Sequence, residues 1–325
     1  MKNKLTPVIV FIVDKTACTF QSVSVHVLQD VGLVEFDANS LSEPPTTSVV
    51  SKLPKGFERR VTSAEQSSVL KAVARLASVC DELGIAYMLY GGTLLGSYRH
   101  HDMVPWDDDV DVLVSVADRR RLRDALADLE PHYGALEYSE RIKFWPSAGS
   151  ARQRPSIPWH WPYVDISFYE ENATHIWDAG PEFRNHYIYP KSMVFPTHLR
   201  PFAGLWLPAP RDSLAFIVAT YSHKRHCSSL FFSHRFEKNI PDSVSMRCHK
   251  LRNVYPFVHR RPAAFVAVPS GSSQRVALSP GIVEVLMLGD LVLHTVLVEE
   301  PTYSTGADPY VLPTRRRLRL LSDTS

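Results

Sequence analysis

The sequence has few cysteines, no long apolar run and no excess of charge of one sign. Four cysteines in 325 residues are too few for a disulfide-rich scaffold. No stretch reaches the roughly 18 apolar residues that a membrane-spanning helix needs. Lys and Arg number 36 against 34 Asp and Glu, and this near balance argues against a nucleic-acid binder that relies on bulk charge. A hydrophobic content of 45% is enough for an ordinary globular core.

The first 60 residues carry no strong hydrophobic period. Two lysines near the start of the sequence precede a short apolar run at Pro7–Val13. This pattern is consistent with a weak targeting signal, the remnant of a membrane anchor, or a strand. Residues Ala38–Pro54 are rich in Ser, Thr and Pro and are typical of a linker. We therefore expect residues 1–60 to form an N-terminal segment and linker, and a catalytic domain to occupy residues 61–260.

That domain opens with a helix, a short strand and a glycine pair. Thr62 and Glu65 form a capping box, and an apolar stripe predicts a helix that ends before Gly84. Residues 86–90 predict a buried strand, after which Gly91 and Gly92 let the backbone turn sharply and approach a ligand. A short helix beginning there would present free N–H groups that attract phosphate.

Four aspartates, at positions 107, 108, 109 and 111, lie between apolar residues. If residues 108–114 form a strand, Asp109 and Asp111 share one face with Asp107, and Asp108 lies on the opposite, more tolerant face. Carboxylates at positions i and i+2 of a strand suit a hard cation such as Mg²⁺. The alternative is a solvated acidic turn, which the apolar flanks and Trp106 disfavour.

The ordered stretch GGTLLGSYRHHDMVPWDDDVDV at residues 91–112 resembles the signature of the LicD family, which includes the fukutin-related proteins. The matching positions are a Gly-Gly-Thr-Leu-Leu-Gly block, an Arg-His pair, and Pro-Trp followed by the four aspartates. The resemblance implies an α/β fold of the nucleotidyltransferase type, with a small mixed sheet and flanking helices. It also implies transfer of a phosphorylated alcohol, such as phosphocholine or ribitol phosphate, from a CDP-activated donor to a glycan.

The resemblance also implies roles for individual residues. Residues 163–168 predict a strand with one acid, Asp165, among apolar neighbours, and a buried charge of this kind needs a partner. In the nucleotidyltransferase scheme a third carboxylate faces the first two, and Asp165 fits that position; the alternative is an ordinary acid at a strand end. The expected catalytic and metal-binding residues are Asp109, Asp111 and Asp165, with Mg²⁺ or Mn²⁺ as cofactor. The expected substrate-binding residues are Gly91, Gly92, Thr93, Arg99, His100 and Asp107.

The rest of the chain carries weaker signals. An arginine-rich helix at residues 117–129 predicts a solvated, ion-paired face in preference to a donor-binding patch. Asp212 is a candidate cap for a helix at residues 213–221. Cys227 and Cys248 are consistent with a disulfide, with free thiols, or with a zinc site that also uses His226, His234 and His249, although no C-x-x-C spacing supports zinc. Residues 261–325 contain no motif and end in a basic tail, so we expect an uncertain, poorly ordered extension.

These observations predict a metal-dependent transferase of phosphorus-containing groups. Its expected partners are a CDP-alcohol donor and a glycan or glycoprotein acceptor, without nucleic acid and with weak membrane association through the N-terminus. The alternatives are a nucleotidyltransferase that leaves a nucleotide on its acceptor, and a non-catalytic glycan-binding relative. The resemblance favours the Golgi or secretory pathway over the cytoplasm. In the secretory pathway the sequon at Asn172 would carry a glycan.

Overall fold

The computed structural model describes residues 7–13, 20–27, 53–221, 226–267 and 278–298. The chain divides into two compact units, one formed by Lys52–Phe257 and the other by Met1–Ser51 with Val258–Ser325. Within the described residues, no helix combines the length and apolar character needed to cross a membrane. Most of the linker predicted at residues 38–54 and the basic tail lie outside the described residues.

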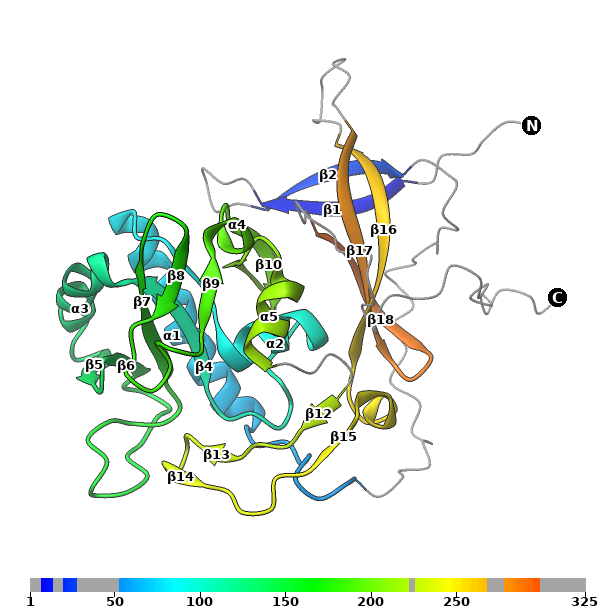
Figure 1. The fold of residues 1–325 in the computed structure, drawn as a ribbon. Coiled ribbons are helices and arrows are strands. Elements are labelled where there is room, and N and C mark those ends of the chain that lie inside the picture. Colours follow the sequence, from blue (N-terminus) through cyan, green and yellow to red (C-terminus); the bar gives the residue numbers. More distant parts are fainter. Residues whose placement is uncertain (1–6, 14–19, 28–52, 222–225, 268–277, 299–325) are drawn as a thin grey trace, which may run out of the picture. The chain divides into compact units, whose positions relative to one another are not determined.

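The unit Lys52–Phe257 is built on a mixed sheet in the order β3-β4-β7-β6-β5, with β8 and β9 continuing from β7 (Figure 1). The strands are β3 (Tyr87–Leu89), β4 (Val110–Ser115), β5 (Tyr133–Tyr138), β6 (Arg141–Pro146), β7 (Val164–Glu171), β8 (His175–Asp178) and β9 (Ile188–Pro190). Strands β4 and β7 run parallel, whereas the other neighbours pair antiparallel. This mixed α/β architecture confirms the predicted fold class.

Helix α1 (Ser63–Leu83) begins and ends where the sequence predicts. The Thr62 side chain accepts the Glu65 backbone N–H, the Glu65 carboxylate accepts the Thr62 N–H, and Gly84 adopts a left-handed conformation with φ 63°. The apolar stripe, including Val69, Val73 and Leu76, is buried. Capping and burial together place the C-terminal end of α1 directly before β3.

The acidic stretch forms a shorter strand than predicted. Helix α2 (Gly91–His100) follows β3, and β4 begins at Val110, two residues after the predicted start at Asp108. Residues 107–109 therefore form the entrance to the strand, where side chains do not follow strict strand alternation. A 3₁₀ turn, η1 (Val116–Asp118), leads to α3 (Arg119–Ala127). The arginines of α3 form ion pairs with nearby acids, as expected for a solvated face.

The second half of this unit consists of short elements. They are α4 (Lys191–Val194), β10 (His198–Phe202), β11 (Leu205–Ala209) and α5 (Ser213–Tyr221), which Asp212 caps as predicted by accepting the Ala215 N–H. Residues 226–251, which we call the strap, contain β12 (His226–Ser228), β13 (Phe232–Ser233), β14 (Lys238–Asn239), β15 (Ser245–Arg247) and the 3₁₀ turn η2 (Cys248–Leu251). The strap pairs β12 with β15 and β13 with β14.

The other unit contains an antiparallel sheet in the order β1-β2-β16-β17-β18. Its strands are β1 (Pro7–Val13), β2 (Phe20–Val27), β16 (Phe257–Ala267), β17 (Leu278–Leu288) and β18 (Leu291–Val298). The apolar run at Pro7–Val13 is thus a strand, one of its three predicted possibilities. Of the extension predicted to be poorly ordered at residues 261–325, the described residues 261–267 and 278–298 belong to strands β16, β17 and β18, and the rest lies outside the described residues. A buried ion pair of 2.7 Å between Arg260 and Glu284 joins β16 to β17.

Candidate active site

Two of the predicted acids lie side by side on the central strands. In the parallel pairing of β4 with β7, Asp111 is in register with Asp165, and the antiparallel pairing of β7 with β6 places Lys143 beside Asp165. Residues in register on neighbouring strands project from the same face of a sheet. The fold therefore aligns two carboxylates and one ammonium group in a single row.

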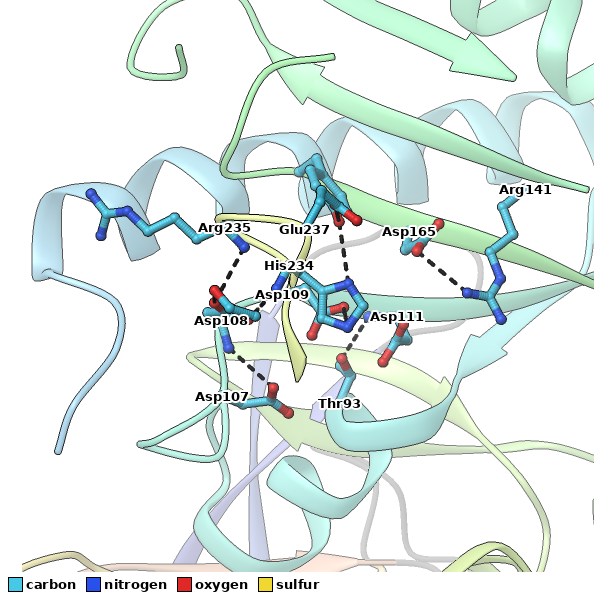
Figure 2. A network of polar contacts seen from close by, with 12 residues as sticks. Thr93, Asp107, Asp108, Asp109, Asp111, Arg141, Asp165, His234, Arg235 and Glu237 are labelled. Carbon is cyan, nitrogen blue, oxygen red and sulfur yellow. Dashed lines mark hydrogen bonds and ion pairs between the residues drawn. The ribbon is translucent and has the colours of Figure 1, made fainter. Parts of the chain in front are cut away.

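Asp107 and Asp109 join this row from the entrance of β4, and Figure 2 shows the four carboxylates gathered near His234. Burial, followed by the charge of Asp108, raises the pKa of Asp107 to about 7. Burial, followed by the charge of Asp165, raises the pKa of Asp111 to about 7. Burial and Asp111 raise the pKa of Asp109 well above its usual range. Such mutual repulsion is characteristic of carboxylates held together for a positively charged ligand.

Gly91 and Gly92 make room for two of these acids. A Cβ atom on Gly91 would lie 2.7 Å from Asp111 Oδ2, and one on Gly92 would lie 2.2 Å from Asp107 Oδ2. Gly91 also has a φ of 51°, which favours glycine. Thr93 is buried, and its hydroxyl accepts the Asp111 backbone N–H at 2.7 Å. The first turn of α2 thus lies close to Asp107 and Asp111, and the predicted contact of both glycines with substrate phosphate stays a prediction.

Asp165 has the partner that its burial demands. Its Oδ2 accepts a hydrogen bond from Lys143 Nζ at 3.1 Å and lies 3.8 Å from Arg141 Nη1. Lys143 also donates to the Tyr163 hydroxyl at 3.0 Å, and that hydroxyl donates to Glu237 Oε1 at 2.7 Å. Asp165 is therefore a member of a buried polar network and not an isolated acid at a strand end.

Asp108 has a different role from its neighbours. It is 2% exposed and accepts hydrogen bonds from the Ser233 hydroxyl at 2.7 Å, the His234 N–H at 3.0 Å and the Arg235 N–H at 3.2 Å. Its carboxylate thus anchors the strap. The prediction that Asp108 lies on a tolerant face was wrong, because this residue precedes β4 and points into a turn from more than 120 residues later in the chain.

The site fits a divalent cation by its own chemistry. Asp109 and Asp165 are 6% and 1% exposed, and within the described residues no hydrogen-bond partner meets Asp109 Oδ2 or Asp165 Oδ1. One potential ligand atom from each of Asp109, Asp165 and His234 lies within 4.8 Å of the others. Burying a carboxylate oxygen without a hydrogen-bond donor costs folding free energy unless a cation or a proton binds to it.

Arg99 and His100 lie in the last turn of α2, about 12 Å along the helix axis from its glycine pair. Arg99 Nη2 donates to the His226 carbonyl at 3.3 Å, and His100 Nδ1 lies 2.6 Å from the Pro256 carbonyl. Burial lowers the pKa of His100 to about 3. Both side chains are buried among protein partners, which gives them a structural role, and their predicted contact with the donor diphosphate stays a prediction.

The strap is closed by a disulfide between Cys227 and Cys248, which selects one of the three predicted states of these cysteines. Arg99 Nη1 lies 3.8 Å from Cys227 Sγ, and the Trp106 indole donates to the Ser228 carbonyl at 2.9 Å. The disulfide therefore fixes the base of the strap against the end of α2 and the Pro-Trp turn. Cys80 is free and buried on the apolar face of α1.

Sequence reasoning missed the residues that surround the acids. Lys143 and Arg141 lie in β6, which carries no motif, and Tyr163 lies two residues before Asp165. His234 was weighed only as a zinc ligand beside the cysteines, and Glu237 was not considered. A Lys between apolar residues, as in IKFWP at residues 142–146, is the local signal that could have indicated a charged partner for Asp165.

Comparison with known proteins relates part of this unit to a family. Residues 84–212 match the family model described as LicD/FKTN/FKRP, nucleotidyltransferase domain. Ribitol 5-phosphate transferase FKRP of Homo sapiens is 32% identical over 169 residues, which cover 50% of this chain and 32% of that protein. Lipopolysaccharide cholinephosphotransferase LicD of Haemophilus influenzae is 35% identical over 86 residues, covering 26% of this chain and 32% of that protein.

Ribitol-5-phosphate transferase FKTN of Homo sapiens is 24% identical over 167 residues, covering 49% of this chain and 33% of that protein. The crystal structure of the lincosamide antibiotic adenylyltransferase LnuA superposes with a TM-score of 0.29 at 15% identity over 46% of this chain and 85% of that one, a likeness too weak to carry an argument. The chain thus spans about one third of the length of the curated relatives it matches. Its residues 84–212 match the LicD/FKTN/FKRP family model, as the glycine and aspartate motifs indicated.

Proposed function

We propose that this protein is a phosphotransferase that moves a phosphorylated alcohol from a CDP-activated donor to a glycan hydroxyl with the help of a divalent cation. The observation that carries the proposal is the row of Asp111 and Asp165 on adjacent parallel strands, joined by Asp109. The names of the matched relatives, which include ribitol-phosphate and choline-phosphate transferases, support the same class of reaction.

In this reaction the acceptor hydroxyl oxygen bonds to the phosphorus of the phospho-alcohol. The bond from that phosphorus to the CMP oxygen breaks, and the hydroxyl proton passes to a base. Asp109, Asp111 and Asp165 would hold Mg²⁺ or Mn²⁺, which would neutralise charge on the donor diphosphate and the leaving CMP. Asp165 already pairs with Lys143 and lies 3.8 Å from Arg141, and its second oxygen is without a hydrogen-bond partner among the described residues, which favours Asp165 as a cation ligand over a role as the proton acceptor.

Arg141 is a further candidate for contact with the donor. Its guanidinium lies beside Asp165 and stacks over the Phe183 ring at 4.9 Å. A planar guanidinium held by an aromatic ring is well suited to bidentate recognition of phosphate. We therefore assign Arg141, in place of Arg99, to the donor phosphates.

The deciding experiment is a screen of CDP-alcohols with glycan acceptors that follows CMP release with and without Mg²⁺ or Mn²⁺. We expect release of CMP from at least one donor, dependent on the cation and on Asp109. Release of pyrophosphate from a nucleoside triphosphate would instead establish the nucleotidyltransferase alternative. Glycan binding without turnover of any donor would establish the non-catalytic alternative.

A further inference from the structure

His234 is held in place by groups outside its own ring. Its backbone N–H is bound by Asp108, and the disulfide at the base of the strap limits movement of the segment that carries it. The neighbouring Arg235 forms an ion pair of 2.9 Å with Glu65 and lies 4.4 Å from the centroid of the Trp161 ring. The imidazole is therefore directed at the acids by the fold.

Hydrogen bonding indicates which nitrogen of His234 carries a proton. His234 Nδ1 lies 3.3 Å from the Tyr163 hydroxyl oxygen. That hydroxyl has one proton, which it gives to Glu237 at 2.7 Å, and it accepts from Lys143 at 3.0 Å. Its remaining capacity is to accept a second hydrogen bond. His234 therefore donates through Nδ1, and a neutral ring keeps a lone pair on Nε2.

That lone pair faces a carboxylate. His234 Nε2 lies 3.3 Å from Asp109 Oδ2, an oxygen that is buried and makes no hydrogen bond within the described residues. Two acceptors at this distance repel unless a cation or proton lies between them. A histidine that ligates a metal almost always donates its other N–H to a neighbouring group, as Nδ1 does here toward Tyr163.

We infer that His234 is a ligand of the same cation that Asp109 and Asp165 bind, and that this nitrogen makes the site prefer Mn²⁺ to Mg²⁺. The inference rests on the cation site of the proposed function. Mg²⁺ favours oxygen ligands, whereas divalent transition metals also accept imidazole nitrogen. Tyr163, Glu237 and Lys143 orient the imidazole without touching the cation.

The test measures Mn²⁺ binding by the whole protein. Electron paramagnetic resonance distinguishes free from bound Mn²⁺ and reports the atoms that coordinate the bound ion. Wild-type protein should show ¹⁴N coupling from an imidazole in its bound Mn²⁺. His234→Ala should lose this coupling, lower Mn²⁺ affinity roughly tenfold or more, and change Mg²⁺ affinity little. His249→Ala, which removes an exposed histidine of the same strap, is the matched control and should behave as wild type.

A second variant tests the orientation of the ring. Tyr163→Phe removes the hydroxyl that accepts from Nδ1 but keeps the aromatic packing. It should retain the ¹⁴N coupling and weaken Mn²⁺ binding by roughly tenfold, the usual effect of losing the partner of a metal-bound histidine.

Two outcomes would overturn the inference in different ways. Mn²⁺ that binds through Asp109 without ¹⁴N coupling, and with equal affinity in His234→Ala, would leave the cation site intact and show that His234 is a protonated partner of Asp109. If the wild-type protein bound neither Mn²⁺ nor Mg²⁺, both the role of His234 and the role of a cation in the proposed function would be contradicted.

Discussion

The acidic segment 107–115 and the strap 226–251 meet at one site but reach it by different means. The acidic segment is positioned by the sheet, because β4 pairs with β3 on one side and with β7 on the other, and the apolar residues of these strands are in register. The strap has only two- and three-residue strands, and it is held by a disulfide and by the hydrogen bonds to Asp108. A central strand is thus held by its neighbours on both sides, whereas a segment of very short strands depends on other attachments.

The largest expected effect comes from neutralising an acid of the sheet. Asp109→Asn and Asp111→Asn keep the size of the side chain but remove a charge from the proposed cation site. Each should lower the rate of CMP release about 10²-fold or more, because charge stabilisation at the reacting phosphate is lost. Circular dichroism should show an unchanged fold. Wild-type turnover by either folded variant, or activity that survives complete chelation of divalent cations, would refute the proposed roles.

The same acids predict a dependence of stability on pH in the absence of divalent cations. The folded-state pKa of Asp111 is about 7, above the ordinary value of 3.8 for an aspartate, so between these values the folded protein keeps a proton that the unfolded chain has released. Stability should therefore fall as pH rises from about 4 to about 7 and stay low above that range. Each pKa unit corresponds to about 1.4 kcal/mol, so the total loss of folding stability over this pH range should be several kcal/mol.

The measurement is the melting temperature in chelator across this range, for wild type and for Asp111→Asn. The variant is required because His100 acts in the opposite direction. Its lowered pKa makes stability rise with pH up to about 6.5, and this contribution cancels in the comparison. The wild type should lose more stability with pH than the variant, and a divalent cation should restore it. Parallel curves would mean that Asp111 is not strained by its neighbours.

Removing the disulfide tests the attachment of the strap. Cys227 and Cys248 are 21 residues apart, and a closed loop of this length contributes about 3 kcal/mol. The double variant Cys227→Ser, Cys248→Ser should show this loss in urea unfolding and should not respond further to reductant. Wild type should weaken on reduction to the level of the variant. An equal stability of oxidised and reduced wild type would show that the strap is held without the bond.

Asp108→Asn tests the second attachment. In the variant an amide NH₂ group, which cannot accept hydrogen bonds, replaces the oxygen that accepts from the Ser233 hydroxyl and the Arg235 N–H. The loss of these two hydrogen bonds should lower the stability by about 2 kcal/mol. Asp128→Asn, a change at an exposed position on the surface, should lose almost nothing. Equal urea midpoints for the two variants would contradict the role of Asp108 as an anchor.

The smallest effect is expected at the sequon. Asn172, Ala173 and Thr174 are exposed in the turn between β7 and β8, outside both segments. In a glycosylating cell the wild type should carry a glycan that a glycosidase removes, and Asn172→Gln should lack the glycan but keep its activity. An unmodified Asn172 together with free thiols at positions 227 and 248 would place the protein in a reducing compartment.

By itself, the sequence determined the elements that depend on neighbouring residues. The capping box at Thr62, the left-handed stop at Gly84, the turn at Gly91 and the burial of Asp165 follow from side-chain chemistry and periodicity within a few residues. The motif at residues 91–112 also indicated the family, because a long ordered match is specific without any knowledge of the fold.

Only the tertiary structure decided what surrounds the acids. Lys143 meets Asp165 through strand register, and His234 meets Asp109 across 125 residues, so neither contact leaves a periodic pattern in the sequence. Asp108 was misplaced because strand alternation was extended two residues too far, into a turn whose geometry depends on the strap. Hydrophobic periodicity specifies which face of an element is buried, whereas the partners of a buried charge are fixed by how distant elements pack.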